Sequence, residues 1–417
     1  MRKLFLASFF ALLSICTYAY DFKVDGIYYN ITGDNTVEVT SNDGQYAGDI
    51  IIPNKVSYDS KEYSVTSIGE NAFYNCSSLT AIDIPASVKS IGNIAFFKCS
   101  DLTSINIPES VESIGYGAFA CCRGLTSIVV ASGNSVYDSR NNCNAIIKTS
   151  DNSLVSGCKN TVIPSNVTSI ESGAFQGCRG LIAIDIPGSV KSIENSAFES
   201  CSSLIAIDIP GSVKSIGEHA FYVCSNLTSI NIPEGVESIE RSTFDGCSSL
   251  TTIDIPASVK SIGVYAFSNC SSLTAINIPE SVTSIGYAAF LGCSSLTAIN
   301  IPASVTVIES WAFYNCDSLA DIYCYASTPA GTVSDTFSQN TYSGCTLHVP
   351  YGTMNAYRAA ANWKKFVNIV EFDPTGVGAV SADGKSAAEQ RIYNLGGVRM
   401  AAPQRGLNII NGKKVIY

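Results

Sequence analysis

The chain has 417 residues, of which 46% are hydrophobic and 14% are charged, and its formal net charge is −10. So much apolar material excludes a disordered protein and is enough for an extended core. The acidic balance, with no basic stripe, argues against a partner recognised through a phosphate backbone, so we expect no nucleic-acid partner.

The first 19 residues have the pattern of an export signal. A basic start is followed by an apolar run, residues 4–15, that is too short to span a bilayer. A small-residue cleavage site at residues 17–19 predicts a mature chain that begins near Tyr20. The alternative, lipid attachment at Cys16, is disfavoured by Ile15 before it. We therefore expect a secreted or cell-surface protein with no transmembrane helix.

Most of the remaining chain is one repeat. A phenylalanine recurs every 23 residues within two groups, and the gap between the groups is 56 residues. The positions are Phe73, Phe96, Phe119, Phe175, Phe198, Phe221, Phe244, Phe267, Phe290 and Phe313. Self-similarity at a fixed period of this length predicts a solenoid.

Each unit reads L-x-x-I-x-I-P-x-x-V-x-x-I-x-x-x-A-F-x-x-C. Ile82 and Ile84 alternate with polar or small residues, which predicts a strand with one buried face. Pro85 ends this strand, and a second short strand follows up to Ile91. The few residues before Phe96 are too short for a stable helix, so we expect a single helical or 3₁₀ turn that places the ring in the core.

One unit alone cannot fold. Its six or so buried apolar side chains contribute roughly 10–15 kcal/mol, whereas ordering its residues costs about 1.5 kcal/mol each. Stacked units share their cores and pair their strands at about 4.8 Å, which removes the deficit.

One cysteine per unit occupies a fixed position. The column contains Cys76, Cys99, Cys122, Cys178, Cys201, Cys224, Cys247, Cys270, Cys293 and Cys316. Equivalent residues of stacked coils have parallel side chains about 4.8 Å apart, which does not suit a disulfide, so we expect small buried thiols. A metal array is the alternative, but each coil offers one sulfur and no histidine, so we expect no metal. Cys143 with Cys158, or Cys324 with Cys345, could form a disulfide.

Units such as "LTSINIPESVESIGYGAF" resemble those of the BspA-like leucine-rich repeat family. The resemblance extends from Ile50 to about Phe372. It implies a leucine-rich repeat solenoid in a bacterial surface or secreted protein, often of Bacteroidetes type. Members of this family are associated with adhesion to host matrix proteins and to other cells. "DGIYYNI" and "TVEVT" are similar to the N-terminal β cap of the family.

These features predict a series of domains. They are a signal peptide (1–19), an N-terminal β cap (20–49), a solenoid (50–325) with a β-hairpin insertion at about 133–160, a C-terminal cap with a helix (326–372), a linker (373–389) and a C-terminal β module (390–417). The hairpin pairs residues 145–149 with residues 153–157. The helix of the cap carries Tyr357 and Trp363. The last module resembles the small sorting modules of exported Bacteroidetes proteins; the alternative is a β appendage without a sorting role.

The sequence offers little for catalysis. It contains no G-x-S-x-G, P-loop, H-E-x-x-H or C-x-x-C motif, and its two histidines, His219 and His348, lie near no nucleophile motif. The exposed position of the first strand is nearly always Asp or Asn: Asp83, Asn106, Asp185, Asp208, Asn231, Asp254, Asn277 and Asn300. A calcium-binding or sugar-cleaving acidic strip is one interpretation. We favour a polar ladder that keeps this face soluble.

Aromatic residues gather at the variable positions beside A-F. They are Tyr74, Phe97, Tyr116, Tyr222, Tyr265, Tyr287, Trp311 and Tyr314. Tyrosine and tryptophan favour protein interfaces, so these eight are our candidate partner-binding residues. The alternative is that the rings only cover the rim of the core.

We expect a non-catalytic protein without a cofactor that binds macromolecules, either proteins or glycans of host matrix or other cells. One alternative is a surface coat of self-associating copies, and another is a glycan-cleaving β-helix. Export machinery is a further expected partner of the C-terminal module.

Overall fold

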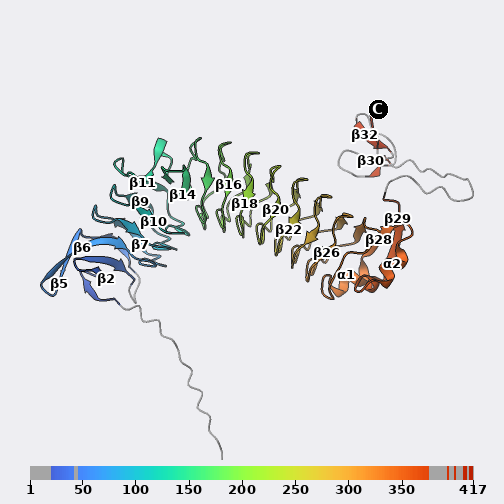
Figure 1. The fold of residues 1–417 in the computed structure, drawn as a ribbon, viewed down its shortest axis with the longest axis horizontal. Coiled ribbons are helices and arrows are strands. Elements are labelled where there is room, and N and C mark those ends of the chain that lie inside the picture. Colours follow the sequence, from blue (N-terminus) through green and yellow to red (C-terminus); the bar gives the residue numbers. More distant parts are fainter. Residues whose placement is uncertain are drawn as a thin grey trace, which may run out of the picture. The chain divides into compact units, whose positions relative to one another are not determined.

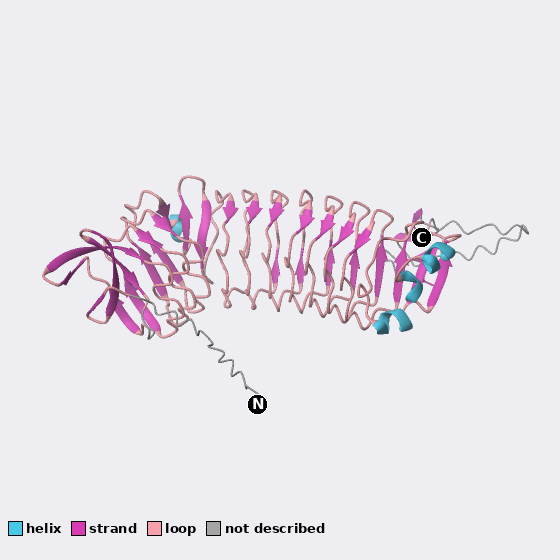
Figure 2. Ribbon diagram, turned by 60° about the horizontal axis from the view of Figure 1, so that its bottom comes forward, coloured by secondary structure: helices cyan, strands magenta, loops and turns pink. Residues whose placement is uncertain are grey.

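The structure is a computed structural model that describes residues 20–41 and 46–374, and the backbone of four short strands further along the chain. It divides into two compact units, one within residues 1–212 and the other within residues 213–417. In each unit, short coils of strand and turn stack side by side (Figures 1 and 2). The predicted β-rich solenoid is confirmed, and it contains very little helix. The predicted signal peptide and all of the linker after Pro374 lie outside the described residues.

Unit 1 begins with a mixed sheet. Its strands are β1 (Phe22–Val24), β2 (Ile27–Gly33), β3 (Thr36–Thr40), β5 (Lys55–Tyr58), β6 (Lys61–Ile68), β8 (Ser90–Ile91) and β10 (Ser113–Ile114). The first three form an antiparallel meander, and β3, β6, β8 and β10 are then paired in parallel. This sheet therefore joins the N-terminal strands to the repeats, and no free edge separates them.

Two columns of strands run through the repeats of unit 1. The first column contains the strand that ends at the I-x-I-P motif: β4 (Gly48–Ile51), β7 (Leu79–Asp83), β9 (Ser104–Ile107), β11 (Ser127–Val130) and β17 (Ala206–Ile207). The second column contains the short S-I strand: β8, β10, β15 (Ser169–Ile170) and β16 (Ser192–Ile193). Between the two groups of repeats lies the insertion, with β12 (Tyr137–Asp138), the 3₁₀ turn η1 (Arg140–Asn142), β13 (Ala145–Lys148) and β14 (Ser153–Gly157). As predicted, β13 and β14 form an antiparallel hairpin.

Unit 2 repeats the same two columns. The first contains β19 (Ser229–Ile230), β21 (Thr252–Asp254), β23 (Ala275–Asn277), β25 (Ala298–Ile301), β27 (Asp321–Cys324), β28 (Thr346–Pro350) and β29 (Asn368–Phe372). The second contains β18 (Ser215–Ile216), β20 (Ser238–Ile239), β22 (Ser261–Ile262), β24 (Ser284–Ile285) and β26 (Val307–Ile308). From β20 to β26 the second column is continuously paired, with serine opposite serine and isoleucine opposite isoleucine up to β24. The first column forms separate sheets, β21–β23 and β25–β27–β28–β29, so its strands do not pair throughout as expected.

The segment around each phenylalanine corrects one expectation, because it is a run of hydrogen-bonded turns and not a helical turn. Residues two before and two after the phenylalanine have left-handed backbones, for example Tyr265 (φ 56°) and Asn269 (φ 56°) around Phe267. The N–H groups of all three donate to carbonyls of the next coil, at 2.9, 2.8 and 2.6 Å. We call this set of bonds the turn ladder. It holds the coils together on the side that has no strands.

The phenylalanines form a stack inside each unit. Neighbouring rings are nearly parallel, with centroids 5.0 Å apart for Phe73–Phe96 and 5.4 Å apart for Phe267–Phe290. Phe221 and Phe244, on which the solenoid prediction depends, are both fully buried. Each ring contacts the corresponding ring of the adjacent coil, so the core is continuous along each unit.

The cysteine column has a polar role besides packing. The thiol of Cys270 donates to the carbonyl oxygen of Phe244 in the preceding coil at 3.2 Å, and Cys99 does the same to Phe73 at 3.1 Å. Cys201, Cys247, Cys293 and Cys316 repeat this contact. All fifteen cysteines within the described residues are free thiols, including the two pairs that could have formed disulfides.

The C-terminal part of unit 2 contains α1 (Gln339–Gly344), α2 (Met354–Ala359) and the 3₁₀ turn η2 (Trp363–Lys365). Tyr357 lies in α2 as predicted, but Trp363 belongs to η2. The helix ends because Ala360 is extended and Asn362 is left-handed (φ 68°). Trp363 is buried and its Nε1 donates to the carbonyl of Ala330 at 2.7 Å. Four further strands are β30 (Ile392–Tyr393), β31 (Arg399–Met400), β32 (Leu407–Ile410) and β33 (Lys413–Ile416), and they pair in antiparallel fashion.

Candidate functional site

The eight candidate partner-binding residues lie outside the core, beside the turn ladder. Four are exposed: Tyr74 (42%), Tyr116 (50%), Trp311 (39%) and Tyr314 (37%). The other four, Phe97, Tyr222, Tyr265 and Tyr287, are half-buried. Their exposure permits contact with a partner, and their role in binding stays a prediction.

The structure brings four of the eight together in unit 2. Tyr265 meets Tyr287 edge-on with ring centroids 5.4 Å apart, and Tyr287 lies 5.6 Å from Trp311. Trp311 in turn lies 6.0 Å from Tyr314. We call these four residues the aromatic patch. Desolvation raises the pKa of Tyr287, and the hydroxyl of Tyr265 contributes to the same shift.

Two residues of the aromatic patch occupy left-handed backbone positions, Tyr265 (φ 56°) and Trp311 (φ 59°). Other coils place Asn71, Ile94, Gly117, His219 or Ser242 at this position. At positive φ the Cβ of a side chain approaches a backbone carbonyl, which costs of order 1 kcal/mol or more; Gly avoids this cost and Asn tolerates the conformation better than most residues. The fold therefore does not require aromatic rings here, which favours a contact surface over a cover for the core.

The remaining candidates are separate from this patch. In unit 1, Tyr74 stacks on Phe97 with centroids 5.4 Å apart, and the ammonium of Lys98 lies 5.3 Å from the centre of the Phe97 ring. Tyr116 borders the insertion. In unit 2, Tyr222 packs edge-on against His219 at 5.7 Å. The eight residues thus do not form one continuous row.

The polar column of the first strands is exposed at every predicted position from Asp83 to Asn300. Across the described parts of the chain, no three His, Cys, Asp or Glu side chains are grouped so that they could hold a metal ion. The geometry therefore gives the acidic-strip interpretation no further ligands.

Sequence reasoning missed a polar and aromatic cluster in the C-terminal part of unit 2. The Nε2 of His348 lies 2.7 Å from Oδ1 of Asp321, and its ring stacks on Tyr323 with centroids 4.1 Å apart. Phe372 meets both rings edge-on. The parallel pairing of β27, β28 and β29 creates this cluster, so its signal was the alternation of residues on three strands far apart in sequence.

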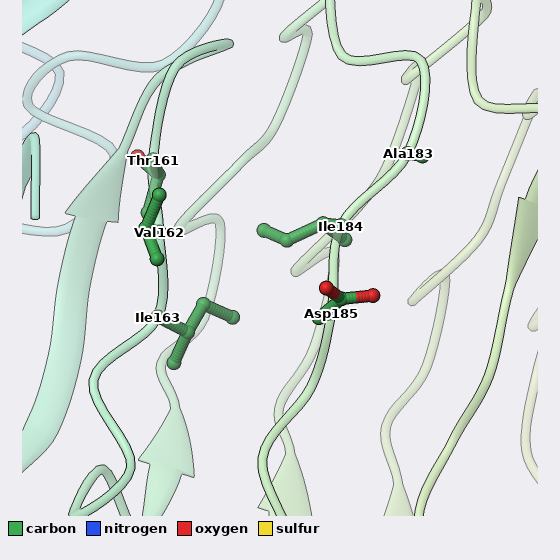
Figure 3. Close-up of a pocket in the computed structure, with 6 residues that line it drawn as sticks. All are labelled: Thr161, Val162, Ile163, Ala183, Ile184 and Asp185. Carbon is green, nitrogen blue, oxygen red and sulfur yellow. The ribbon is translucent and has the colours of Figure 1, made fainter.

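A shallow pocket of about 210 Å³ on the first-strand face of unit 1 was also missed (Figure 3). It lies between Thr161–Val162–Ile163 and Ala183–Ile184–Asp185, which have no strand structure and share no hydrogen bond. Val162 (72%) and Ile182 (60%) are exposed beside it. Two departures from the repeat pattern could have indicated this pocket: Val162 replaces the usual Asp or Asn, and Ile182 replaces the usual Thr.

Comparison with known proteins agrees with this architecture. The family model described as "BspA type Leucine rich repeat region" matches six copies, over residues 54–150, 153–274 and 237–349. The chain therefore belongs to the BspA-type leucine-rich repeat family. No curated protein matches it. Membership supports a non-catalytic repeat protein.

Several solved structures are similar to this chain. A leucine-rich repeat protein of Eubacterium ventriosum is 23% identical, with a TM-score of 0.51, and the match covers 69% of this chain and 92% of that one. A leucine-rich cell surface protein of Faecalibacterium prausnitzii is 26% identical, with 86% and 95% covered and a TM-score of 0.48. A leucine-rich repeat protein of Bacteroides ovatus is 24% identical, with a TM-score of 0.44, and the match covers 85% of this chain and 100% of that one. The first of these shows the shared fold.

None of the helices in the described residues has the length and apolar character needed to cross a membrane.

Proposed function

We propose that this protein is exported and binds a macromolecular partner without catalysis, through the aromatic patch of Tyr265, Tyr287, Trp311 and Tyr314. The observation that carries the proposal is that four aromatic rings of neighbouring coils contact one another outside the core, two of them at left-handed positions where other coils have Asn, Gly, Ser, Ala, Ile or His. Large, rigid rings with a polar end are also the side chains that dominate protein interfaces.

The partner is a protein or glycan of host matrix or of other cells. Membership of the BspA-type family supports this class of partner. Export is supported by the signal pattern of residues 1–19. The resemblance of residues 390–417 to small sorting modules supports a role of this β module in export. The N-terminal residue of the exported protein is expected to be Tyr20; recovery of a chain that still begins with Met1 would contradict export by this signal.

The main test replaces Tyr265, Tyr287 and Trp311 with Asn, a residue that other coils already accept at these positions, as at Asn71 and Asn93. Binding to a panel of purified matrix proteins and glycans is expected to weaken by about tenfold or more, because central aromatic anchors carry much of the affinity. The urea midpoint is expected to stay unchanged or to rise, since two strained positions are relieved.

The matched control is Ile94→Asn, which makes the same change at the same left-handed position of another coil (φ 45°). It should leave binding unchanged. Equal loss of binding in the control and in the triple variant would contradict the role of the aromatic patch. If the triple variant instead alters self-association, measured by sedimentation, the surface-coat function replaces the one proposed here.

A further inference from the structure

The insertion opens the turn ladder of unit 1 at one place. In regular coils the residue two before the phenylalanine donates to the residue three before the phenylalanine of the next coil, as Tyr265 does to Tyr287. At the insertion these positions are Gly117 and Ser172, and no hydrogen bond joins them. The next bond of the ladder, from the Phe119 N–H, is also missing, because the carbonyl of Ala174 accepts from Gly157 instead at 2.9 Å. The ladder closes again at Cys121, whose N–H donates to the carbonyl of Gln176 at 2.7 Å. Two donors and the Ser172 carbonyl are therefore left open between the two coils.

Two hydroxyl groups beside this opening also have unused hydrogen-bonding capacity. The Tyr137 hydroxyl accepts the N–H of Ile114 at 3.1 Å, and its own hydrogen has no acceptor among the described residues. Ser153 is only 2% exposed, and its Oγ makes no hydrogen bond. The nearby Asp151 carboxylate accepts the backbone N–H of Ser153 at 3.0 Å, but it does not accept from Oγ in hydrogen-bond geometry. A buried hydroxyl without a partner costs about 1–3 kcal/mol, so it needs an explanation.

These groups surround one cavity of about 280 Å³. Its lining includes Tyr116, Gly117, Tyr137, Ser153, Glu171 and Ser172. Tyr116 forms part of the wall, and its ring lies close to Gly173, where an added Cβ would be 3.4 Å from the ring. Lys148 pairs with Asp151 at 3.3 Å, whereas Glu171 has no ion pair within the described residues. The cavity thus contains hydrogen-bond donors, acceptors and an aromatic ring, with no net positive charge.

We propose that this cavity binds a single neutral sugar ring, such as the terminal residue of a glycan. Sugar hydroxyls both donate and accept, which matches the open N–H of Gly117, the open carbonyl of Ser172 and the two hydroxyl groups. The apolar face of a pyranose packs against an aromatic ring, and Tyr116 provides one. An anion is disfavoured because Lys148 is already paired and Glu171 would repel it. A cavity of this size lies just below the range of ligand pockets, roughly 300–1,000 Å³, and fits one ring and not a chain.

This site is independent of the proposed function, because the aromatic patch of unit 2 contributes no residue to it. The test is saturation-transfer NMR on the full chain with five neutral probes: glucose, galactose, mannose, N-acetylglucosamine and N-acetylgalactosamine. At least one is expected to bind in the millimolar range. Ser153→Ala should weaken binding of this sugar by about fivefold to tenfold. Tyr116→Ala should remove the saturation transfer to the protons on the sugar ring.

Ser153→Ala is expected to fold at least as stably as the parent, because it removes a buried hydroxyl without a partner. The matched control is Ser87→Ala, since the Ser87 Oγ also lacks a partner but lies outside the cavity. The proposal is overturned if none of the five sugars binds, or if Ser87→Ala weakens binding as much as Ser153→Ala. It is also overturned if galacturonate or the dipeptide Gly-Gly binds in place of the neutral sugars, with the same dependence on Ser153.

Discussion

Raising the pH from about 7 to about 10 is expected to unfold the protein, because the cysteine column must remain protonated in the folded state. Burial raises the pKa of Cys76, Cys178 and Cys316 in this column, and of Cys345 outside it, to about 12. It raises the pKa of Cys247, Cys270 and Cys293 well above the ordinary value. In the unfolded chain these thiols ionise near pH 8.5. Through these thiols, the folded and unfolded states therefore bind different numbers of protons only in the alkaline range.

The direction of the effect follows from linkage. Below about pH 8.5 the thiols are protonated in both the folded and the unfolded state, so they contribute no pH dependence to the free energy of unfolding. Between the unfolded and folded pKa values the folded state binds more protons, and each buried thiol lowers the free energy of unfolding by about 1.4 kcal/mol per pH unit. The summed loss of free energy from several such thiols exceeds the free energy of unfolding of an ordinary domain, roughly 5–15 kcal/mol. The array should therefore lose its fold within one to two pH units above the ordinary thiol pKa.

Urea midpoints measured by circular dichroism at pH 7, 8, 9 and 10 would check this expectation. A double variant, Cys270→Ala with Cys293→Ala, serves as the control. It removes two titrating groups, so its alkaline slope should be shallower by about 2.8 kcal/mol per pH unit. Near pH 7 the double variant should lose only a small part of its stability. The carbonyl of Phe244, which loses the thiol donor of Cys270, still accepts the N–H of Cys247 at 3.1 Å. A midpoint that does not move between pH 7 and pH 10 would show that the thiols are not buried as described.

The sequence predicted the stack of phenylalanines because its signal is purely periodic. Every repeat phenylalanine from Phe73 to Phe313 is buried, and a 23-residue period is enough to place them in one row. It did not predict the conformation of the turns. The left-handed positions of these turns carry ordinary side chains such as Ile94, His219 and Tyr265, so the sequence of a single coil does not indicate a positive φ there. Only the aligned column, with Gly117 and Gly173 among its members, indicates positive φ.

The candidate surfaces also differ in whether the sequence period alone predicts them. The aromatic patch could be predicted because its four members lie on consecutive coils, where spacing in the sequence fixes spacing in the solenoid. The cavity at the insertion could not be predicted, because Tyr116 and Glu171 become neighbours only after the hairpin between them is folded. Which groups lose their partners there, such as the Ser153 hydroxyl, depends on a break in hydrogen bonding that no residue type marks.

Replacing Phe267 with alanine is expected to destabilise unit 2 by about 3–5 kcal/mol. The Phe267 ring is fully buried between Phe244 and Phe290, with centroids 5.4 Å away on both sides. Its loss leaves a cavity that the coils cannot close, because the turn ladder fixes their spacing through the bond from Phe267 N–H to Ala289 at 2.8 Å. Chemical unfolding of the full chain measures the effect. Phe97→Ala is the control, since that ring is only half-buried, and it should cost about 1 kcal/mol or less.

The location of the damage tests the solenoid more sharply than its size. In a stack where each coil contacts only its neighbours, stability is a sum of local terms and the loss should remain local. Hydrogen exchange should therefore speed up at the N–H groups of Phe244 and Phe290, which donate to Ala266 and Ala312. The Phe73 N–H, which bonds to Ala95 in unit 1, should exchange at its original rate. Equal acceleration at Phe73 would mean that the array unfolds as one cooperative body, and additive coils could then no longer explain why the chain repeats its unit.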